Sequence, residues 1–104
     1  MAAASAIPLI TLLTDFGTAD TCVGSMKGAI LGINPEARIV DLTHEVPVHN
    51  IRSGAYLLQT ATRYFPPGTI HVAVVDPGVG SARRPLLVST STQHFLAPDN
   101  GLLS

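Results

Sequence analysis

The chain has few of the residues that mark several common protein classes: one cysteine, no tryptophan and only 12% charged residues. The single cysteine, Cys22, excludes an internal disulfide and a metal site built from several cysteines. No apolar run approaches the ~20 residues that a membrane-spanning helix needs. No basic stripe is present, and Arg83-Arg84 is the only adjacent basic pair. We therefore expect neither a membrane nor a nucleic acid as a partner.

The first eight residues contain no lysine or arginine and no long apolar core, so we expect no signal peptide and a cytoplasmic protein. The 104 residues fit one domain at most, and 46% hydrophobic content argues against disorder. The charged share is about half of the usual ~25%. This low charge suggests that a partner subunit or a further part of the chain covers some apolar surface.

Apolar runs predict five strands, at residues 9–14, 38–42, 70–75, 86–89 and 94–97. A first helix is expected after Asp20 or Thr21 as its cap and ends at Asn34-Pro35, and a second runs from the N-cap Asn50 to about Arg63. The order βαβαβ followed by two strands predicts an α/β fold, with a mostly parallel sheet, flanking helices and right-handed crossovers.

The first predicted helix is unusual in its small residues. Gly24, Gly28 and Gly32 fall on one face and each weakens a helix by about 1 kcal/mol, so we expect close packing of that face against the sheet. Cys22 is expected to be a small buried packing residue rather than a nucleophile, since no base follows it locally. Lys27 is expected to be solvated, or to lie along its apolar stem.

Two predicted strands each end in an aspartate, and a loop with glycines follows. Such strand ends are where ligands bind in parallel α/β sheets. In the first loop, Asp15 can accept two hydrogen bonds from a ribose diol or balance a cationic ligand, or it can cap the helix and hold its own loop.

The second loop runs from Asp76 to Arg84 and has glycines and two arginines, but it lacks the Gly-Lys-Ser/Thr ending of a P-loop. Its other interpretation is a water-positioning pair, in which Arg83 keeps Asp76 charged and Asp76 accepts a hydrogen bond from water. Arg84 is expected at the surface or in an interface.

Five further polar residues have a structural or a functional interpretation. Asp20 can cap the first helix or bind an ammonium group, and Asn100 can form a plain turn or bond to a ligand edge. Asp41 can pair with His44 or Arg38 in a structural role. His44 and His49 have no third ligand nearby, so we expect no metal site.

Five segments in one order resemble the S-adenosyl-L-methionine (SAM) hydrolase (adenosine-forming) family, relatives of fluorinase and chlorinase, from about Leu9 to Ser104. They are Leu-Thr-Asp-Phe-Gly (13–17), Gly-Ser-Met-Lys-Gly (24–28), Ile-Val-Asp-Leu-Thr-His (39–44), Gly-Thr-Ile-His-Val-Ala-Val-Val-Asp-Pro-Gly-Val-Gly (68–80) and Phe-Leu-Ala-Pro-Asp-Asn-Gly-Leu-Leu-Ser (95–104).

The resemblance implies a two-domain chain, α/β then a smaller β-barrel, that forms trimers with SAM bound between subunits. Residues 1–104 are then a partial N-terminal SAM-binding domain without the barrel, and we expect a truncated chain whose catalytic histidine lies beyond Ser104. The implied reaction is hydrolysis of SAM to adenosine and L-methionine by in-line attack of water on the ribose C5′. It needs no metal or other cofactor.

The resemblance also implies roles for individual residues. Asp76 and Arg83 are the catalytic residues that orient water, and aspartate where fluorinase has tyrosine favours hydrolysis over halogenation. The implied substrate-binding residues are Asp15 on the ribose hydroxyls, Asp20 on the methionine amine, and Phe16, His49 and Asn100. The alternatives are a non-catalytic SAM- or nucleoside-binding fragment and a SAM-dependent halogenase.

Overall fold

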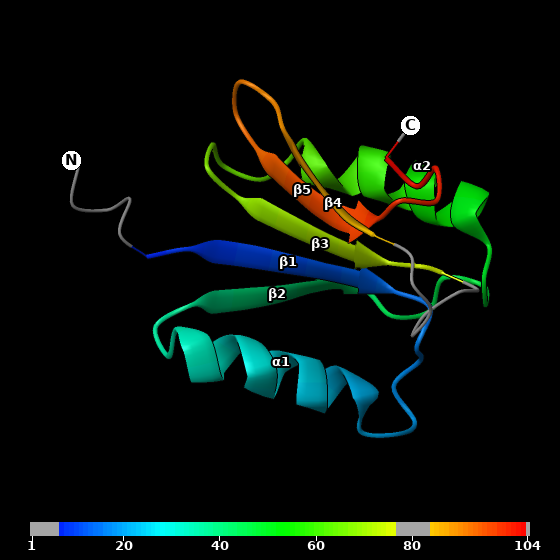
Figure 1. Ribbon diagram of the computed structural model, residues 1–104, viewed down its shortest axis with the longest axis horizontal. Coiled ribbons are helices and arrows are strands. Elements are labelled where there is room, and N and C mark those ends of the chain that lie inside the picture. The colour runs from blue at the N-terminus through cyan, green and yellow to red at the C-terminus, as the bar shows by residue number, and fades with distance from the viewer. Residues whose placement is uncertain (1–6, 77–83, 104) are drawn as a thin grey trace.

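The computed structural model describes residues 7–76 and 84–103 and shows one sheet with two helices (Figure 1). The expected elements are all present, with strand ends that differ by a residue. They are β1 (Leu9–Thr14), α1 (Cys22–Ile33), β2 (Arg38–Thr43), α2 (Ile51–Thr62), β3 (Ile70–Val74), β4 (Pro85–Ser89) and β5 (His94–Pro98). Neither described helix combines the length and apolar character needed to cross a membrane.

The five strands lie in the order β2-β1-β3-β5-β4. β1 pairs in parallel with β2 and β3, and β3 pairs in parallel with β5, so the predicted mostly parallel sheet is confirmed. β4 is antiparallel to β5, because a short polar turn joins them and leaves no room for a crossover.

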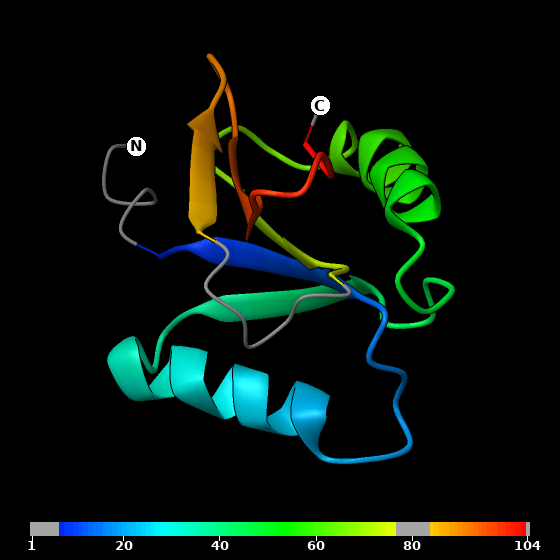
Figure 2. The same ribbon diagram turned by 45° about the vertical axis from the view of Figure 1, so that its right-hand side comes forward.

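The two helices lie on different sides of the sheet (Figures 1 and 2). The chain leaves β1 through α1 to reach β2 on one side, then returns through α2 to reach β3 on the other side of β1. Right-handed crossovers in opposite directions place their helices on opposite faces. The carboxyl ends of β1 and β3 therefore flank a topological switch point, where ligands bind in this fold class.

The β1–β2 register shifts near the carboxyl end of β2. Leu12 pairs with Asp41, but Leu13 pairs with Thr43, so Leu42 is one extra residue on β2. An extra residue of this kind changes which face the following side chains occupy. Leu42 packs against the core on the α2 side.

The main core lies between the sheet and α2. Its buried members are Leu13, Val46, Leu58, Ala73, Val75, Ala97 and Leu102. The expected N-cap is confirmed, since the Asn50 side chain accepts from the Ser53 N–H at 3.0 Å. Gly54 lets α2 approach closely, because a Cβ there would lie 3.1 Å from side-chain atoms of Val75 and Leu102.

Two expectations for α1 are wrong. A Cβ added at Gly24, Gly28 or Gly32 would meet no atom within 4 Å among the residues that the structure describes, so this face does not pack on the sheet. Cys22 is exposed rather than buried. The partly buried apolar residues of α1 are Val23, Met26 and Ile30, whereas the three glycines and Cys22 lie at exposed positions of the helix.

Candidate functional site

Asp15 and Asp76 lie beyond the carboxyl ends of neighbouring parallel strands. Thr14 is paired with Val74, and Asp15 directly follows the first while Asp76 comes two residues after the second. Both aspartates therefore lie at the same edge of the sheet, at the switch point. Asp76 is buried, with 4% of its surface exposed, and Asp15 is partly buried.

The Asp15 carboxylate is held by the loop that follows β2. Its Oδ2 accepts the backbone N–H of His49 at 2.7 Å. His49 has φ 61°, a left-handed conformation that is uncommon for residues other than glycine. Such conformations concentrate at functional sites, where the surrounding structure enforces them. A carboxylate has about four acceptor positions, so this bond orients Asp15 and leaves capacity for ligand hydroxyls.

The loops after β1 and β2 are joined by backbone hydrogen bonds. The Gly17 N–H donates to the carbonyl of His44 at 2.7 Å, and the Val46 N–H donates to the carbonyl of Thr14 at 3.3 Å. Gly17 has φ +73°, so the turn after Phe16 favours glycine. The two loops therefore form one unit around Asp15.

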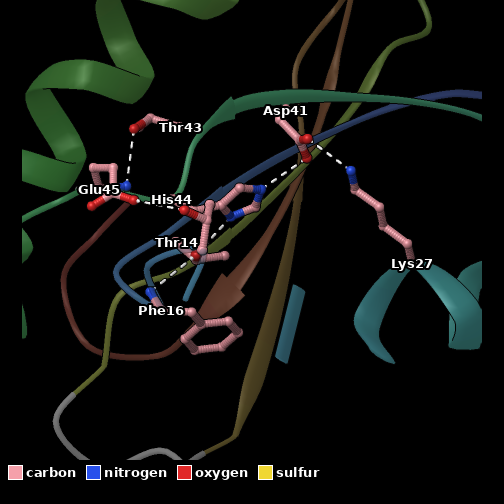
Figure 3. A network of polar contacts seen from close by, with 8 residues as sticks. Thr14, Phe16, Lys27, Asp41, Thr43, His44 and Glu45 are labelled. Carbon is pink, nitrogen blue, oxygen red and sulfur yellow. Dashed lines mark hydrogen bonds and ion pairs between the residues drawn. The ribbon is translucent and has the colours of Figure 1, made fainter. Parts of the chain in front are cut away.

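A series of polar contacts extends from α1 to the two joined loops that follow β1 and β2 (Figure 3). Lys27 Nζ donates to Asp41 Oδ2 at 2.7 Å, and His44 Nε2 lies 2.8 Å from Asp41 Oδ1. His44 Nδ1 lies 2.8 Å from Thr14 Oγ1, which accepts the Phe16 N–H at 3.2 Å. The expected pairing of Asp41 with His44 is confirmed.

Lys27, rather than Arg38, takes the second oxygen of Asp41, so Lys27 is an ion-pair partner and not simply solvated. Partial burial opposes ionisation of Asp41, but the hydrogen bonds from Lys27 and His44 outweigh it, so the pKa of this carboxyl is lowered. Asp41 is therefore negatively charged at neutral pH.

Asp20 acts at the start of α1. Its Oδ1 accepts the Cys22 N–H at 2.9 Å, and the hydrogen bonds with Cys22, first that of the backbone, lower the pKa of Asp20. The nearby carboxylate in turn raises the pKa of the Cys22 thiol, through a hydrogen bond and through its charge. The N-cap position of α1 is thus Thr21, which makes no side-chain capping hydrogen bond, while Asp20 just before it accepts the first N–H of the helix. The raised pKa gives Cys22 no activation as a nucleophile. Binding of an amine by Asp20 stays a prediction.

Asn100 attaches the last described segment to the end of β3. Its Nδ2 donates to the carbonyl of Val75 at 2.8 Å, and its Oδ1 accepts the Leu102 N–H at 3.1 Å. Both ends of the side-chain amide therefore serve the turn, as the structural interpretation expects. A contact between Asn100 and a ligand stays a prediction.

The remaining predicted residues are placed as follows. Phe16 is partly buried beside Thr14, and Arg84 is exposed, as expected. Arg83 and the glycine-rich part of its loop lie outside the described residues, so the pairing of Arg83 with Asp76 stays a prediction. Within residues 7–76 and 84–103, no group of three or more His, Cys, Asp or Glu side chains could hold a metal ion.

Sequence reasoning missed Thr14 as a functional residue. The sequence places it only at the end of a strand and in the 13–17 segment, whereas its hydroxyl contacts both His44 and the backbone of Phe16. The sequence does offer one signal for this contact. Thr14 is the last residue of β1 and His44 directly follows β2, so both lie at the carboxyl ends of strands.

The chain is similar to several known proteins. The N-terminal domain of SAM hydroxide adenosyltransferase matches residues 10–104. The chain is 50% identical to (R)-S-adenosyl-L-methionine hydrolase from Methanocaldococcus jannaschii, covering 94% of this chain and 39% of that protein. It is 28% identical to a fluorinase from an Actinoplanes species, covering 93% of this chain and 40% of that protein.

A crystal structure of an uncharacterised conserved protein from Thermotoga maritima superposes with a TM-score of 0.86 at 45% identity, over 90% of this chain and 36% of that chain. The chain thus spans well under half the length of these relatives. The extent of the match, residues 10–104, shows that the chain belongs to the SAM hydroxide adenosyltransferase family, to its N-terminal domain.

Proposed function

We propose that the full-length protein hydrolyses SAM to adenosine and L-methionine. The observation that supports this most is the placement of Asp15 and Asp76 at one switch point, in a chain 50% identical to a protein named as a SAM hydrolase. One carboxylate is then available for the sugar and another for the attacking water.

In the proposed mechanism, Asp15 accepts hydrogen bonds from the two ribose hydroxyls, while the His49 N–H holds the carboxylate in place. Asp20 faces the methionine amine, and Phe16, His49 and Asn100 line the site. These contacts fix the sugar so that its C5′ faces the carboxyl edge of β3.

Asp76 and Arg83 are proposed to orient the attacking water. Its oxygen forms a bond to C5′ as the C5′–S bond breaks, and the bonding electrons leave with sulfur, so the sulfonium departs as a neutral thioether. The attacking water releases one proton to the solvent. A neutral leaving group needs no general acid, metal or redox cofactor. Orientation of the water and exclusion of solvent can supply roughly 7–11 kcal/mol of the barrier reduction.

The substrate configuration is part of the proposal. The relatives' name carries the prefix (R) in addition to the L of methionine, so we infer that it describes the sulfonium sulfur. We expect the full-length protein to prefer the (R) form of SAM.

The decisive experiment incubates full-length protein with the (R) and (S) forms of SAM separately and measures adenosine and methionine by chromatography. SAM binding without product would favour the non-catalytic module. A 5′-halogenated adenosine formed with added chloride or fluoride would favour the halogenase.

Two variants separate binding from chemistry. Asp15→Ala removes both ribose acceptors, so the Kd for SAM should rise at least tenfold, about 1.4 kcal/mol. Asp76→Asn keeps the size of a buried side chain but removes its charge, so kcat should fall while Kd stays within about threefold. Glu36→Gln, in the exposed turn before β2, is the matched control. An unchanged Kd in Asp15→Ala would remove the ribose assignment.

We also propose that the full-length protein is a cytoplasmic homotrimer that binds neither membranes nor nucleic acid. The apolar side chains that α1 leaves exposed support an interface, with Ile33 at 89% exposure and Leu31 at 39%. Sedimentation equilibrium tests the trimer, and a monomer at micromolar concentration would contradict it.

A further inference from the structure

The polar contacts in Figure 3 connect the surface of α1 with both residues that flank Asp15. At one end, Lys27 and Asp41 are partly exposed, with 34% and 39% of their side chains accessible. Further in, His44 is 4% exposed and Thr14 is fully buried. The contacts end on the Phe16 N–H, so a surface ion pair is linked to the backbone of the loop that presents Asp15.

For a neutral His44 ring, hydrogen-bond chemistry fixes the direction of each of these four contacts. A lysine ammonium only donates, and an ionised Asp41 only accepts, so His44 must donate from Nε2 to Asp41. In neutral histidine the other nitrogen then accepts, so the Thr14 hydroxyl donates to Nδ1. The Thr14 oxygen keeps a lone pair for the Phe16 N–H. One tautomer of His44 therefore satisfies all four contacts at once.

The location of these contacts argues for more than local packing. Thr14 and Phe16 are the two neighbours of Asp15 in the chain, and the same loop as His44 supplies the His49 N–H to the Asp15 carboxylate. The carbonyl of His44 also accepts the Gly17 N–H on the far side of Asp15. A shift of the His44 ring would therefore move the backbone on which Asp15 is carried.

We propose that His44 is a positioning residue for SAM binding: Asp41 holds its ring in the Nε2–H tautomer, and the ring fixes Thr14 and the loop that carries Asp15. The role rests on the proposed function, because it is exerted on the ribose-binding carboxylate. It predicts an effect on binding rather than on the chemical step, since the ribose contacts exist in both ground and transition states.

Asp41→Asn tests the tautomer without changing the shape of the side chain. Because Lys27 only donates, the amide oxygen must face Lys27 and the amide nitrogen must donate to His44 Nε2. The ring proton then moves to Nδ1 and points at Thr14, whose own hydroxyl hydrogen loses its acceptor in a fully buried position. In the full-length protein we expect Kd and KM for SAM to rise at least tenfold, with kcat within threefold.

The double variant Lys27→Met with Asp41→Asn provides the rescue. Without the ammonium, the Asn amide is free to turn so that its oxygen accepts from His44 Nε2, and the original tautomer returns. We expect SAM affinity within threefold of that of Lys27→Met alone. A merely structural role predicts the opposite, because the double variant has lost both the charge of Asp41 and its ion-pair partner.

Nitrogen chemical shifts of the His44 ring report the tautomer, and Glu36→Gln controls for loss of a negative charge elsewhere. The proposal is overturned if Asp41→Asn leaves either the tautomer or the Kd for SAM unchanged, or if the double variant is as impaired as the single one. If the unaltered protein neither binds nor hydrolyses SAM, the proposed function fails instead. Faster hydrogen exchange of the Phe16 amide in Asp41→Asn would still support His44 as the residue that fixes this loop, and unchanged exchange would refute it.

Discussion

The two helices have the same length, 12 residues, but very different environments. α2 buries Gly54, Leu58 and Thr62 against the sheet, whereas no residue of α1 is buried. α2 contributes to an apolar core, while α1 has only partly buried apolar residues and an ion pair, Lys27–Asp41, with the sheet. The α2 face of the sheet thus has the larger apolar core, and the α1 face combines the buried Leu12 with the polar contacts that reach the candidate site.

The largest expected difference between the faces concerns leucine truncation. Leu58→Ala should lower the free energy of unfolding by about 3 kcal/mol, because it opens a cavity in the α2 core. Leu31→Ala on α1 should cost less than about 1 kcal/mol, since Leu31 is 39% exposed. Urea unfolding of the full-length protein measures both. Equal losses would mean that α1 is covered in the assembled protein.

A second test concerns the effect of low pH on stability, through a buried histidine on the α2 face of the sheet. His71 is fully buried, its Nδ1 lies 2.6 Å from Thr11 Oγ1, and its Nε2 has no hydrogen-bond partner in the part of the chain that the structure describes. Burial lowers the pKa of His71, and the nearby Gln93 side chain offsets this only in part. Between that lowered value and the ordinary value near 6.5, the unfolded chain binds a proton that the folded chain does not.

Stability should therefore fall as the pH drops below about 6.5 and stop falling once the pH is below the folded pKa, with a slope of at most about 1.4 kcal/mol per pH unit. Replacing both partners by apolar residues, Thr11→Val with His71→Phe, should remove this component. Denaturation curves at several pH values measure it. A slope that persists in the double variant would assign the effect to other groups.

The smallest expected effect is a gain. Gly28→Ala in α1 should stabilise the protein by about 0.5–1 kcal/mol, because alanine is the better helix former and a Cβ there meets nothing within 4 Å in the described chain. The same substitution at Gly54 adds a Cβ 3.1 Å from two side chains and should give no such gain. Thermal unfolding compares the two. Loss of stability at Gly28 would mean that another surface packs on α1.

Sequence patterns predicted the strands, the helices and the sheet edge at which Asp15 and Asp76 lie. These features are local, because they depend on an apolar run and on the residues that directly follow it. The patterns did not predict the exposure of α1. Helical spacing shows which side chains share a face, but not whether anything covers that face. The contact between Thr14 and His44 was also missed, because it depends on β1 lying beside β2 and on the exact register of the pair.

The extra residue on β2 has a consequence for the candidate site. In a regular strand, residues three apart point to opposite faces, so Asp41 and His44 would be separated by the thickness of the sheet. With Leu42 inserted into the pairing, both reach the α1 side, while Leu42 itself joins the apolar core. The Asp-x-x-His spacing thus works only in an irregular strand. Deleting Leu42 would restore regular pairing and leave Asp41 and His44 two positions apart, where a regular strand again places them on one face. The contact therefore depends on the match between the residue spacing and the irregularity of the strand.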